Sequence, residues 1–517
     1  MKIAIIHYHL NRGGVTRVIA NQLHSLSRFL EQTDGEAVQV LLLFDGQALG
    51  WPGQEIASLE RVDVELHSVP ELGYDPEPRA RPAGLAERLR ERLQQARFSP
   101  ETTVVHVHNH ALGKNASVPG ALGELAREGY PLLLQIHDFA EDFRPANYRH
   151  LVESLAGHDL AEVLYPQASH IHYAVLNRRD RRVLTEAGVE PDRLHWLPNP
   201  VPPFPDRPDR DAARAILEER CGVPRSKPYA LYPVRGIRRK NLGETLLWSA
   251  ALDGAVRFGV TLAPLNPKEI PIYSRWTQIA RELALPLVFE TGADKGLTFA
   301  QNLAAADAVL TTSVAEGFGM VFLEAWLAGR PLFGRNLAEI TADFVDAGLR
   351  LDNLYSQLMV PVDWAGPDEF REALAESYGR TLAAYGLPAP DAAELARLAE
   401  RKMPDGWVDF ADLDEPLQHR VLERVATESA ARETLRDRNE RFARLAEVST
   451  SDFSAVIAHN RNVIEADYSM APSGRRLAAV YEAVSRSPRT DRLDRLPAGE
   501  AILQSFLGFG RFRLIRT

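Results

Sequence analysis

The chain is nearly free of cysteine and lacks long apolar runs. Cys221 is the single cysteine among 517 residues, so no internal disulfide and no cysteine-rich metal site is expected. For such a lone thiol we expect a small core residue rather than a nucleophile. No apolar run approaches the roughly 18 residues of a transmembrane helix, and the apolar start MKIAII is too short for a signal peptide. These absences predict a cytoplasmic enzyme.

An excess of basic charge is also missing. Lys and Arg number 60 against 70 Asp and Glu, which gives a formal net charge of −10. A dedicated nucleic-acid-binding protein would carry a basic surface, so nucleic acid is not an expected partner. The apolar fraction of 45% and the charged fraction of 25% are typical of a globular protein, and the length predicts at least two domains.

Strand-like apolar runs alternate with helical patterns from the first residue onward. This alternation is typical of parallel sheets covered by helices, so the predicted class is α/β with Rossmann-like, doubly wound lobes. A stiff connector with six prolines between Pro198 and Pro208 separates two such regions. The end of the chain reads as two helices broken at Met470–Gly474. We predict an N-terminal lobe over residues 1–205, a C-terminal lobe over 206–465 with a helical stretch at 368–444, and further helices over 466–517.

The stretch Glu316–Glu324, EGFGMVFLE, is the strongest functional motif. It follows an apolar strand and begins a short helix, and Gly317 and Gly319 allow a tight turn between the two. Backbone N–H groups and the positive end of the helix dipole would then meet at one point, which is a site for an anion such as phosphate. Glu316 and Glu324 flank this point and accept hydrogen bonds from sugar hydroxyls. The motif therefore predicts a nucleotide-sugar site, and an ordinary turn with two solvated glutamates is the alternative.

Arg235 and Lys240 lie in PVRGIRRKN, directly after another predicted strand. A guanidinium fork and an ammonium group suit a diphosphate, and fixed cations would stabilise the charge that develops on a departing nucleoside diphosphate. Arg238 and Arg239 lie in the same loop, and we expect their side chains to be solvated. Solvation of the whole basic cluster is the alternative interpretation.

Two further motifs follow strands of the first lobe. Gly13 and Gly14 in NRGGV leave the backbone open to a phosphate or a sugar. A simple turn explains them equally well, and the dinucleotide motif G-x-G-x-x-G is absent. His137 ends the strand PLLLQI, where a substrate contact is expected in a doubly wound sheet. A hydrogen-bonded loop histidine is the alternative.

The alternating histidines of VVHVHNH raise the question of a metal site. On a strand, His106, His108 and His110 would share one face. No carboxylate lies among them, so we expect packing rather than metal binding.

With these residues assembled, the chain resembles the retaining glycosyltransferases of family 4, which include glycogen-synthase-like and sucrose-synthase-like enzymes. The resemblance covers most of the chain and is specific mainly in its second half. AADAVLTTSVAEGFGMVFLEAWLAGRP is similar to the family's E-x7-E block nearly residue for residue, and Arg235 and Lys240 match its diphosphate-binding pair. Gly13 and Gly14 match the glycine loop of the first lobe, and His137 matches the position that touches the donor sugar.

The resemblance implies the two-lobed GT-B fold. It also implies transfer of a hexosyl group from a nucleoside-diphosphate sugar to an acceptor hydroxyl, with retention at the anomeric carbon. Glu316 would face the sugar hydroxyls, and Glu324 would hold the ribose hydroxyls. The leaving diphosphate would itself accept the acceptor's proton. The groups that stabilise it would be Arg235, Lys240 and the backbone N–H groups of Gly317, Phe318, Gly319 and Met320.

The same resemblance implies that neither a metal nor a bound cofactor takes part, because the family mostly works without a metal. No Asp-x-Asp motif occurs among the residues assigned to the site. The expected partners are the nucleotide-sugar donor and a small-molecule, glycan or lipid-linked glycan acceptor. A peripheral membrane contact and the oligomeric state stay open. In this fold the last helices cross back onto the first lobe, which we expect for residues 466–517.

Two other functions fit the same fold. A nucleotide-sugar epimerase or hydrolase would turn over the donor without an acceptor. A non-catalytic sugar-nucleotide-binding protein would need no catalytic residues, and the presence of Glu316, Arg235 and Lys240 argues against it.

Overall fold

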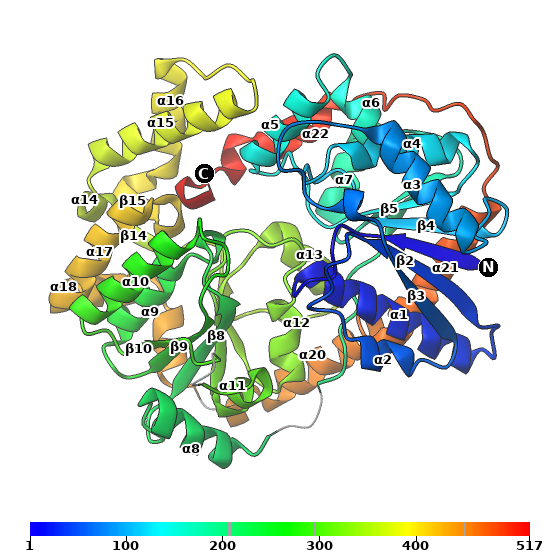
Figure 1. Cartoon of the computed structure of the whole chain (residues 1–517). Coiled ribbons are helices and arrows are strands. Elements are labelled where there is room, and N and C mark those ends of the chain that lie inside the picture. Colours follow the sequence, from blue (N-terminus) through cyan, green and yellow to red (C-terminus); the bar gives the residue numbers. More distant parts are fainter. Residues whose placement is uncertain (205–207, 293–295, 449, 517) are drawn as a thin grey trace. The chain divides into compact units, whose positions relative to one another are not determined.

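The chain forms two compact units in the computed structural model, which describes residues 1–204, 208–292, 296–448 and 450–516 (Figure 1). Unit 1 comprises Met1–Pro202 and Ala466–Gly508, and unit 2 comprises Pro203–Glu465 and Phe509–Thr517. The chain therefore passes from one unit to the other three times. Residues 205–207 of the proline-rich connector lie outside the described residues.

Unit 1 is built on a parallel sheet of seven strands in the order β3-β2-β1-β4-β5-β6-β7. Its inner strands β1, β4, β5 and β6 are buried on both faces, as parallel strands between two helical layers are. In β1, Ile3 and Ile5 belong to one apolar core, and Ala4 and Ile6 belong to a second core on the other face. The strands are β1 (Lys2–Ile6), β2 (Val38–Phe44), β3 (Val62–Ser68), β4 (Thr103–His108), β5 (Leu132–Ile136), β6 (Ile171–Val175) and β7 (Leu194–Trp196).

Helices cover both faces of this sheet (Figure 1). The core that contains Ile3 and Ile5 also contains Leu477, Val480 and Tyr481 of the C-terminal helix α21. The helices of unit 1 are α1 (Gly14–Gln32), α2 (Gly53–Ala57), α3 (Pro82–Gln95), α4 (Ser117–Arg127), α5 (Pro145–Ser154), α6 (Leu160–Leu164), α7 (Arg178–Ala187), α21 (Met470–Arg486) and α22 (Glu500–Leu507).

The two predicted helices are present as α20 (Ser454–Asp467) and α21, but the predicted position of the break is wrong. The break lies at Tyr468 and Ser469, and Met470–Gly474 form the first turns of α21. Pro472 is tolerated there, since the first turn of a helix has N–H groups without intrahelical acceptors. Gly474 lies against α1, where a Cβ atom would fall 2.0 Å from the carbonyl oxygen of Ser25. The glycine that suggested a helix end therefore permits close packing of two helices.

Unit 2 has a second parallel sheet, of six strands in the order β10-β9-β8-β11-β12-β13. A two-stranded antiparallel sheet, β14-β15, accompanies it. The strands are β8 (Tyr229–Arg235), β9 (Arg257–Leu262), β10 (Leu287–Phe289), β11 (Ala308–Thr311), β12 (Leu332–Arg335), β13 (Leu354–Tyr355), β14 (Met359–Pro361) and β15 (Trp407–Asp409).

Four helices of unit 2, α8, α11, α16 and α17, begin after a residue whose side chain caps the helix. For example, α8 begins after Asp209, whose carboxylate accepts a hydrogen bond from the backbone N–H of Ala212 at 2.8 Å, and ends at Gly222 with a left-handed φ of 68°. The lone thiol, Cys221, lies half-buried at the end of α8. The helices are α8 (Arg210–Cys221), α9 (Leu242–Leu252), α10 (Ile270–Glu282), α11 (Phe299–Ala305), α12 (Val321–Leu327), α13 (Ala338–Asp346), α14 (Val362–Ala365), α15 (Pro367–Ala384), α16 (Ala392–Lys402), α17 (Glu415–Thr427), α18 (Ser429–Arg438) and α19 (Arg441–Ala446).

Two segments of unit 2 differ from the sequence expectations. The stretch 368–444 is mostly helical but also contains β15, which pairs with β14. The chain crosses to unit 1 within α20 (Ser454–Asp467) and returns after Gly508, so the end of the predicted segment 466–517 belongs to unit 2. Among the described residues, no helix has both the length and the apolar character needed to span a bilayer.

Candidate active site

Two loops meet at the point in unit 2 where the strand order reverses. One loop follows β8 and contains the short 3-10 helix η3 (Arg238–Lys240), and the other follows β11 and leads into α12. β8 and β11 are adjacent. β9 and β10 lie beyond β8, whereas β12 and β13 lie beyond β11. In doubly wound sheets, ligands bind beyond the carboxyl ends of the strands at such a reversal. The motifs PVRGIRRKN and EGFGMVFLE therefore share one site.

Glu316 links these two loops. Its Oε2 accepts a hydrogen bond from Nη1 of Arg239 at 2.7 Å, and its Oε1 contacts Nζ of Lys240. The Glu316 side chain is 8% exposed. Burial opposes its ionisation, but Lys240 and Arg239 outweigh burial and lower the pKa of Glu316 to about 2. The carboxylate is therefore charged at neutral pH and is held by two cations.

The arginines of the first loop have more contacts than the sequence predicted. Arg239 also donates to the carbonyl oxygen of Ala315 at 2.6 Å. Arg238 donates to both carboxylate oxygens of Glu415, at 2.5 and 2.8 Å. The expectation that Arg238 and Arg239 are only solvated is therefore wrong. Arg238 fixes the loop because a two-pronged arginine–carboxylate pair has a defined geometry. Arg239 joins the loop to the segment after β11.

Arg235 differs from these two arginines. Its Nη1 donates to the carbonyl oxygen of Ala263 at 2.8 Å. Within the residues that the structure describes, it forms no ion pair with a carboxylate. Its remaining guanidinium donors are therefore uncommitted, which suits the predicted role in binding a diphosphate.

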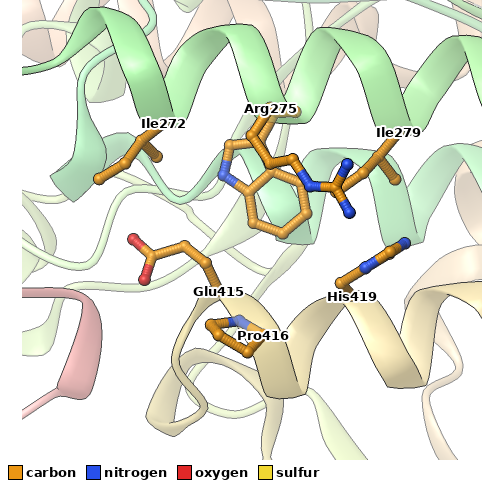
Figure 2. A pocket seen from close by; sticks show the side chains of 7 residues that line it. Ile272, Arg275, Ile279, Glu415, Pro416 and His419 are labelled. Atoms are coloured by element: carbon orange, nitrogen blue, oxygen red, sulfur yellow. The ribbon is translucent and has the colours of Figure 1, made fainter.

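A cavity of about 290 Å³ lies beside the pair of Arg238 and Glu415 (Figure 2). Figure 2 shows its wall as side chains of α10 facing side chains of α17. Its lining consists of Ile272, Arg275, Trp276, Ile279, Glu415, Pro416 and His419. None of the residues predicted for the active site lines it, so it is a separate feature of unit 2.

Glu324 lies in α12, one helical turn after the glycine turn. Burial raises the pKa of its carboxyl group to about 7. Among the described residues, no hydrogen bond to this carboxyl group is formed. A half-buried carboxylate without a partner is suited to accept hydrogen bonds from the hydroxyls of a ligand.

The glycine turn itself has a conformation that requires glycine. Gly319 has a φ of +83°, and a Cβ there would approach the ring of Phe322 to 2.6 Å. Phe318 is buried and its ring packs edge-on against Phe344, with centroids 5.5 Å apart. Its side chain therefore anchors the turn, and its contribution to ligand binding would come from the backbone. Gly317 and Met320 flank these two residues in the same turn.

The glycine loop of unit 1 is open to solvent. Gly13 is the residue before α1, and both Gly13 and Gly14 are exposed. A Cβ atom at Gly14 would meet no atom within 4 Å. The packing of unit 1 does not require glycine here, so the open space above the loop remains available to a ligand.

His137 is buried and directly follows β5, the strand beside β4; the strand order of this sheet reverses between β4 and β1. Its Nε2 lies 2.9 Å from Nδ1 of His108, and its backbone N–H donates to Oδ1 of Asn109 at 2.7 Å. Burial lowers the pKa of His137 to about 4. The ring is therefore neutral at physiological pH and can donate or accept a hydrogen bond.

The three histidines of VVHVHNH do not act together. His106 contacts the hydroxyl of Tyr481 at 2.9 Å, whereas His110 contacts the carbonyl oxygen of Leu164 at 2.8 Å. In the part of the chain that the structure describes, no three histidine, cysteine or acidic side chains come together as metal ligands.

Sequence reasoning missed three functional contacts of this region. Glu415 and Asn109 are distant in sequence from the residues that they hold, so no local motif could show them. Arg239 was visible as part of a basic run, but its pairing with Glu316 depends on the fold.

Known proteins share this sequence pattern and this fold. Residues 6–200 match the family described as glycosyl transferase 4-like domain. The mannosylglucosyl-3-phosphoglycerate synthase of Petrotoga mobilis is 27% identical over 426 residues, which cover 80% of this chain and 79% of that enzyme.

Solved structures agree on the architecture. Anabaena HepE in complex with UDP and glucose has a TM-score of 0.52 at 14% identity, with 93% of this chain and 100% of that chain covered. A glycosyltransferase from Rickettsia africae has a TM-score of 0.54 at 12% identity, with 94% and 99% covered. At these identities the likeness shows the fold, and it confirms the predicted GT-B class. The chain therefore has the GT-B fold, and its residues 6–200 match a glycosyl transferase 4-like domain, which makes it similar to glycosyltransferases.

Proposed function

We propose that the protein is a retaining glycosyltransferase that moves a hexosyl group from a nucleoside-diphosphate sugar to an acceptor hydroxyl. The observation that carries this proposal is the charged Glu316 between Lys240 and Arg239, at the strand reversal of unit 2. Two cations and a buried carboxylate at one point supply groups for both a diphosphate and a sugar. The crystal structure of HepE with UDP and glucose supports a donor of this class.

Each residue of the site has a proposed role in the reaction. The bond from the anomeric carbon to the diphosphate oxygen breaks, and Lys240 and Arg235 stabilise the negative charge that develops on the diphosphate. The acceptor oxygen forms the new bond on the same face, and its proton passes to an oxygen of the leaving diphosphate. Glu316 accepts hydrogen bonds from the sugar, and Glu324 accepts hydrogen bonds from the ribose.

Residues of unit 1 have proposed substrate contacts as well. His137 is neutral, so it can hydrogen-bond a sugar hydroxyl without contributing charge. Gly13 and Gly14 are exposed and would offer their backbone N–H groups to a ligand. The name of the Petrotoga relative favours a small phosphorylated acceptor over a long glycan.

Donor screening tests this function. Thermal shifts are measured with UDP, GDP and ADP and with UDP-glucose and GDP-mannose, since a ligand at about 100 times its Kd adds about 2.7 kcal/mol of stability. The donor that binds is then incubated with glucosyl-3-phosphoglycerate, 3-phosphoglycerate, glucosylglycerate and free sugars, and the anomeric configuration of any product is read by NMR. A product of inverted configuration would contradict retention. Release of free sugar without transfer to any acceptor would favour a hydrolase.

We also propose that catalysis needs no metal ion. Turnover is measured in EDTA and after addition of Mg²⁺ or Mn²⁺. Complete loss in EDTA with recovery on metal addition would overturn this part of the proposal.

A further inference from the structure

The last residues of the chain pack onto unit 2, although the segment before them belongs to unit 1. The backbone carbonyl of Phe512 accepts a hydrogen bond from Nζ of Lys402 at 2.9 Å. The rings of Phe509 and Phe512 both pack against Tyr378, with centroids 5.2 and 4.9 Å away. The final 3-10 helix, η8 (Leu514–Arg516), follows directly. The C-terminal segment therefore packs against α15, which contains Tyr378, and α16, which contains Lys402.

The apolar side of η8 lies against the active-site loops. Ile515 is 2% exposed and forms a small core with Val314 and Ala411. Val314 precedes Glu316 by two residues, and its backbone N–H donates to the carbonyl oxygen of Arg239 at 3.0 Å. η8 also contacts η3, the turn that contains Arg239 and Lys240. The packing of Ile515 therefore supports both loops that meet at Glu316.

A series of buried charged side chains also connects the C-terminal segment with the loop that contains Lys240. Arg513 donates to Oδ2 of Asp409 at 3.2 Å and also contacts Asp412. Asp409 accepts from Arg335 at 2.8 Å, and Arg335 in turn donates to Glu244 at 2.6 Å. The side chains of Arg335, Asp409 and Glu244 are at most 2% exposed.

This series ends at the active-site loop. Glu244 accepts a hydrogen bond from Nδ2 of Asn241 at 2.8 Å, and Asn241 directly follows Lys240. Asn241 has a φ of +50°, in the left-handed region, so its conformation depends on such contacts. Side-chain hydrogen bonds therefore connect Arg513 with Asn241, the residue next to Lys240, without a gap.

The charges of this series balance only when the tail is present. The carboxylates are Glu244, Asp409 and Asp412, and the cations are Arg335, Lys402 and Arg513. Removing the Arg513 side chain leaves one buried negative charge without compensation, which disturbs the arrangement of the remaining groups.

We propose that the C-terminal segment, through Ile515 and Arg513, is a positioning element of the donor site. It holds the loops so that Lys240 and Arg239 stand on either side of Glu316. Ile515 and Arg513 act through the residues that they contact, so in this proposal both are positioning residues. Small displacements of such groups matter, because a misplacement of about 1 Å can reduce the rate on the order of 100-fold. The proposal rests on the function proposed above for the same loops.

Hydrogen exchange measured by mass spectrometry tests the positioning directly and needs no ligand. The variants are Ile515→Ala and Arg513→Met, and the control is Leu217→Ala, which removes a buried aliphatic side chain from α8 of the same unit. We expect faster exchange in peptides covering 235–241 and 312–320 in both tail variants. The control should leave these peptides unchanged at a similar loss of melting temperature. Equal exchange in the tail variants and the control would overturn the proposal.

Kinetics separate positioning from general stability. Turnover with the donor identified by the screen is expected to fall by about tenfold or more in Ile515→Ala and Arg513→Met, with wild-type turnover in Leu217→Ala. Arg513→Lys, which keeps the charge, should recover part of the loss. If Lys240→Ala abolishes turnover while the tail variants behave as the control, only the positioning role fails. If Lys240→Ala itself keeps full turnover, the donor-site assignment fails instead.

Discussion

The ammonium group of Lys240 contacts the carboxylate of Glu316, 76 residues further along the chain. Burial lowers the pKa of Lys240, and Glu316 partly offsets that effect. Lys240 follows β8 and Glu316 follows β11, so their contact joins the two loops at the strand reversal. Under the proposed function, a bound diphosphate would compete with Glu316 for Lys240, and this would leave Glu316 available to bind the sugar hydroxyls.

The first prediction concerns the two cations assigned to the diphosphate. Lys240→Ala and Arg235→Ala should each lower kcat by about 100- to 1000-fold, because loss of one group that stabilises developing charge costs on the order of 3–4 kcal/mol. The matched control is Lys268→Ala, since Lys268 is exposed in the same unit. Steady-state kinetics on all three variants decide the question. Wild-type kcat in both site variants would disprove the assignment.

The second prediction concerns Glu324 and pH. Burial raises its pKa from 4.5 to about 7, so in this window the folded protein keeps a proton that the unfolded chain has lost. Stability contributed by this group is therefore lost as the pH rises towards about 7. Glu324→Gln should become more stable relative to wild type as the pH rises through this window. The measurement is the difference in melting temperature between the two proteins across the window, and a constant difference would contradict the shifted pKa.

Glu324→Gln also tests the role in binding. Glutamine keeps the size of the side chain but loses the charged acceptor. The affinity for the nucleoside diphosphate that binds wild type should therefore fall, as measured by calorimetry above pH 7, where wild-type Glu324 is charged. If wild type and Glu324→Gln bound the nucleoside diphosphate with equal affinity, Glu324 would not bind the ribose. The predicted effect of Glu324 on stability would not be affected by that result.

The third prediction concerns the buried histidines of unit 1. Burial lowers the pKa of His137 to about 4 and that of His106 to about 3. Below the ordinary value of 6.5 the unfolded chain takes up protons that the folded protein does not, so acid destabilises the fold. His106→Gln should lower the melting temperature at about pH 7.5 and lower it less at about pH 5. The same decrease at both pH values would show that folding does not lower the pKa of His106.

The sequence could predict the local features of this protein, but not the contacts between residues that are distant in the chain. The loops at Arg235–Lys240 and Glu316–Glu324 could be placed after strands because glycine, apolar runs and charge are local signals. The pairing of Arg238 with Glu415 could not, since 177 residues separate them. The same holds for Arg513, whose buried partners come from other parts of unit 2. Sequence periodicity assigns residues to elements, but it does not assign partners to charges.

The last prediction concerns two glycines in helices, which should respond in opposite ways to the same substitution. Gly474 in α21 packs against α1, and a Cβ there would lie 2.0 Å from the backbone oxygen of Ser25, which cannot move without the helix. Gly84 in α3 has no atom within 4 Å of its Cβ position. Gly84→Ala should therefore stabilise the protein by about 0.5–1 kcal/mol, because alanine favours the helix. Gly474→Ala should destabilise it by about 1–3 kcal/mol, the usual cost of overpacking. Urea unfolding of both variants gives the two free energies, and equal values would show that α21 does not pack closely on α1.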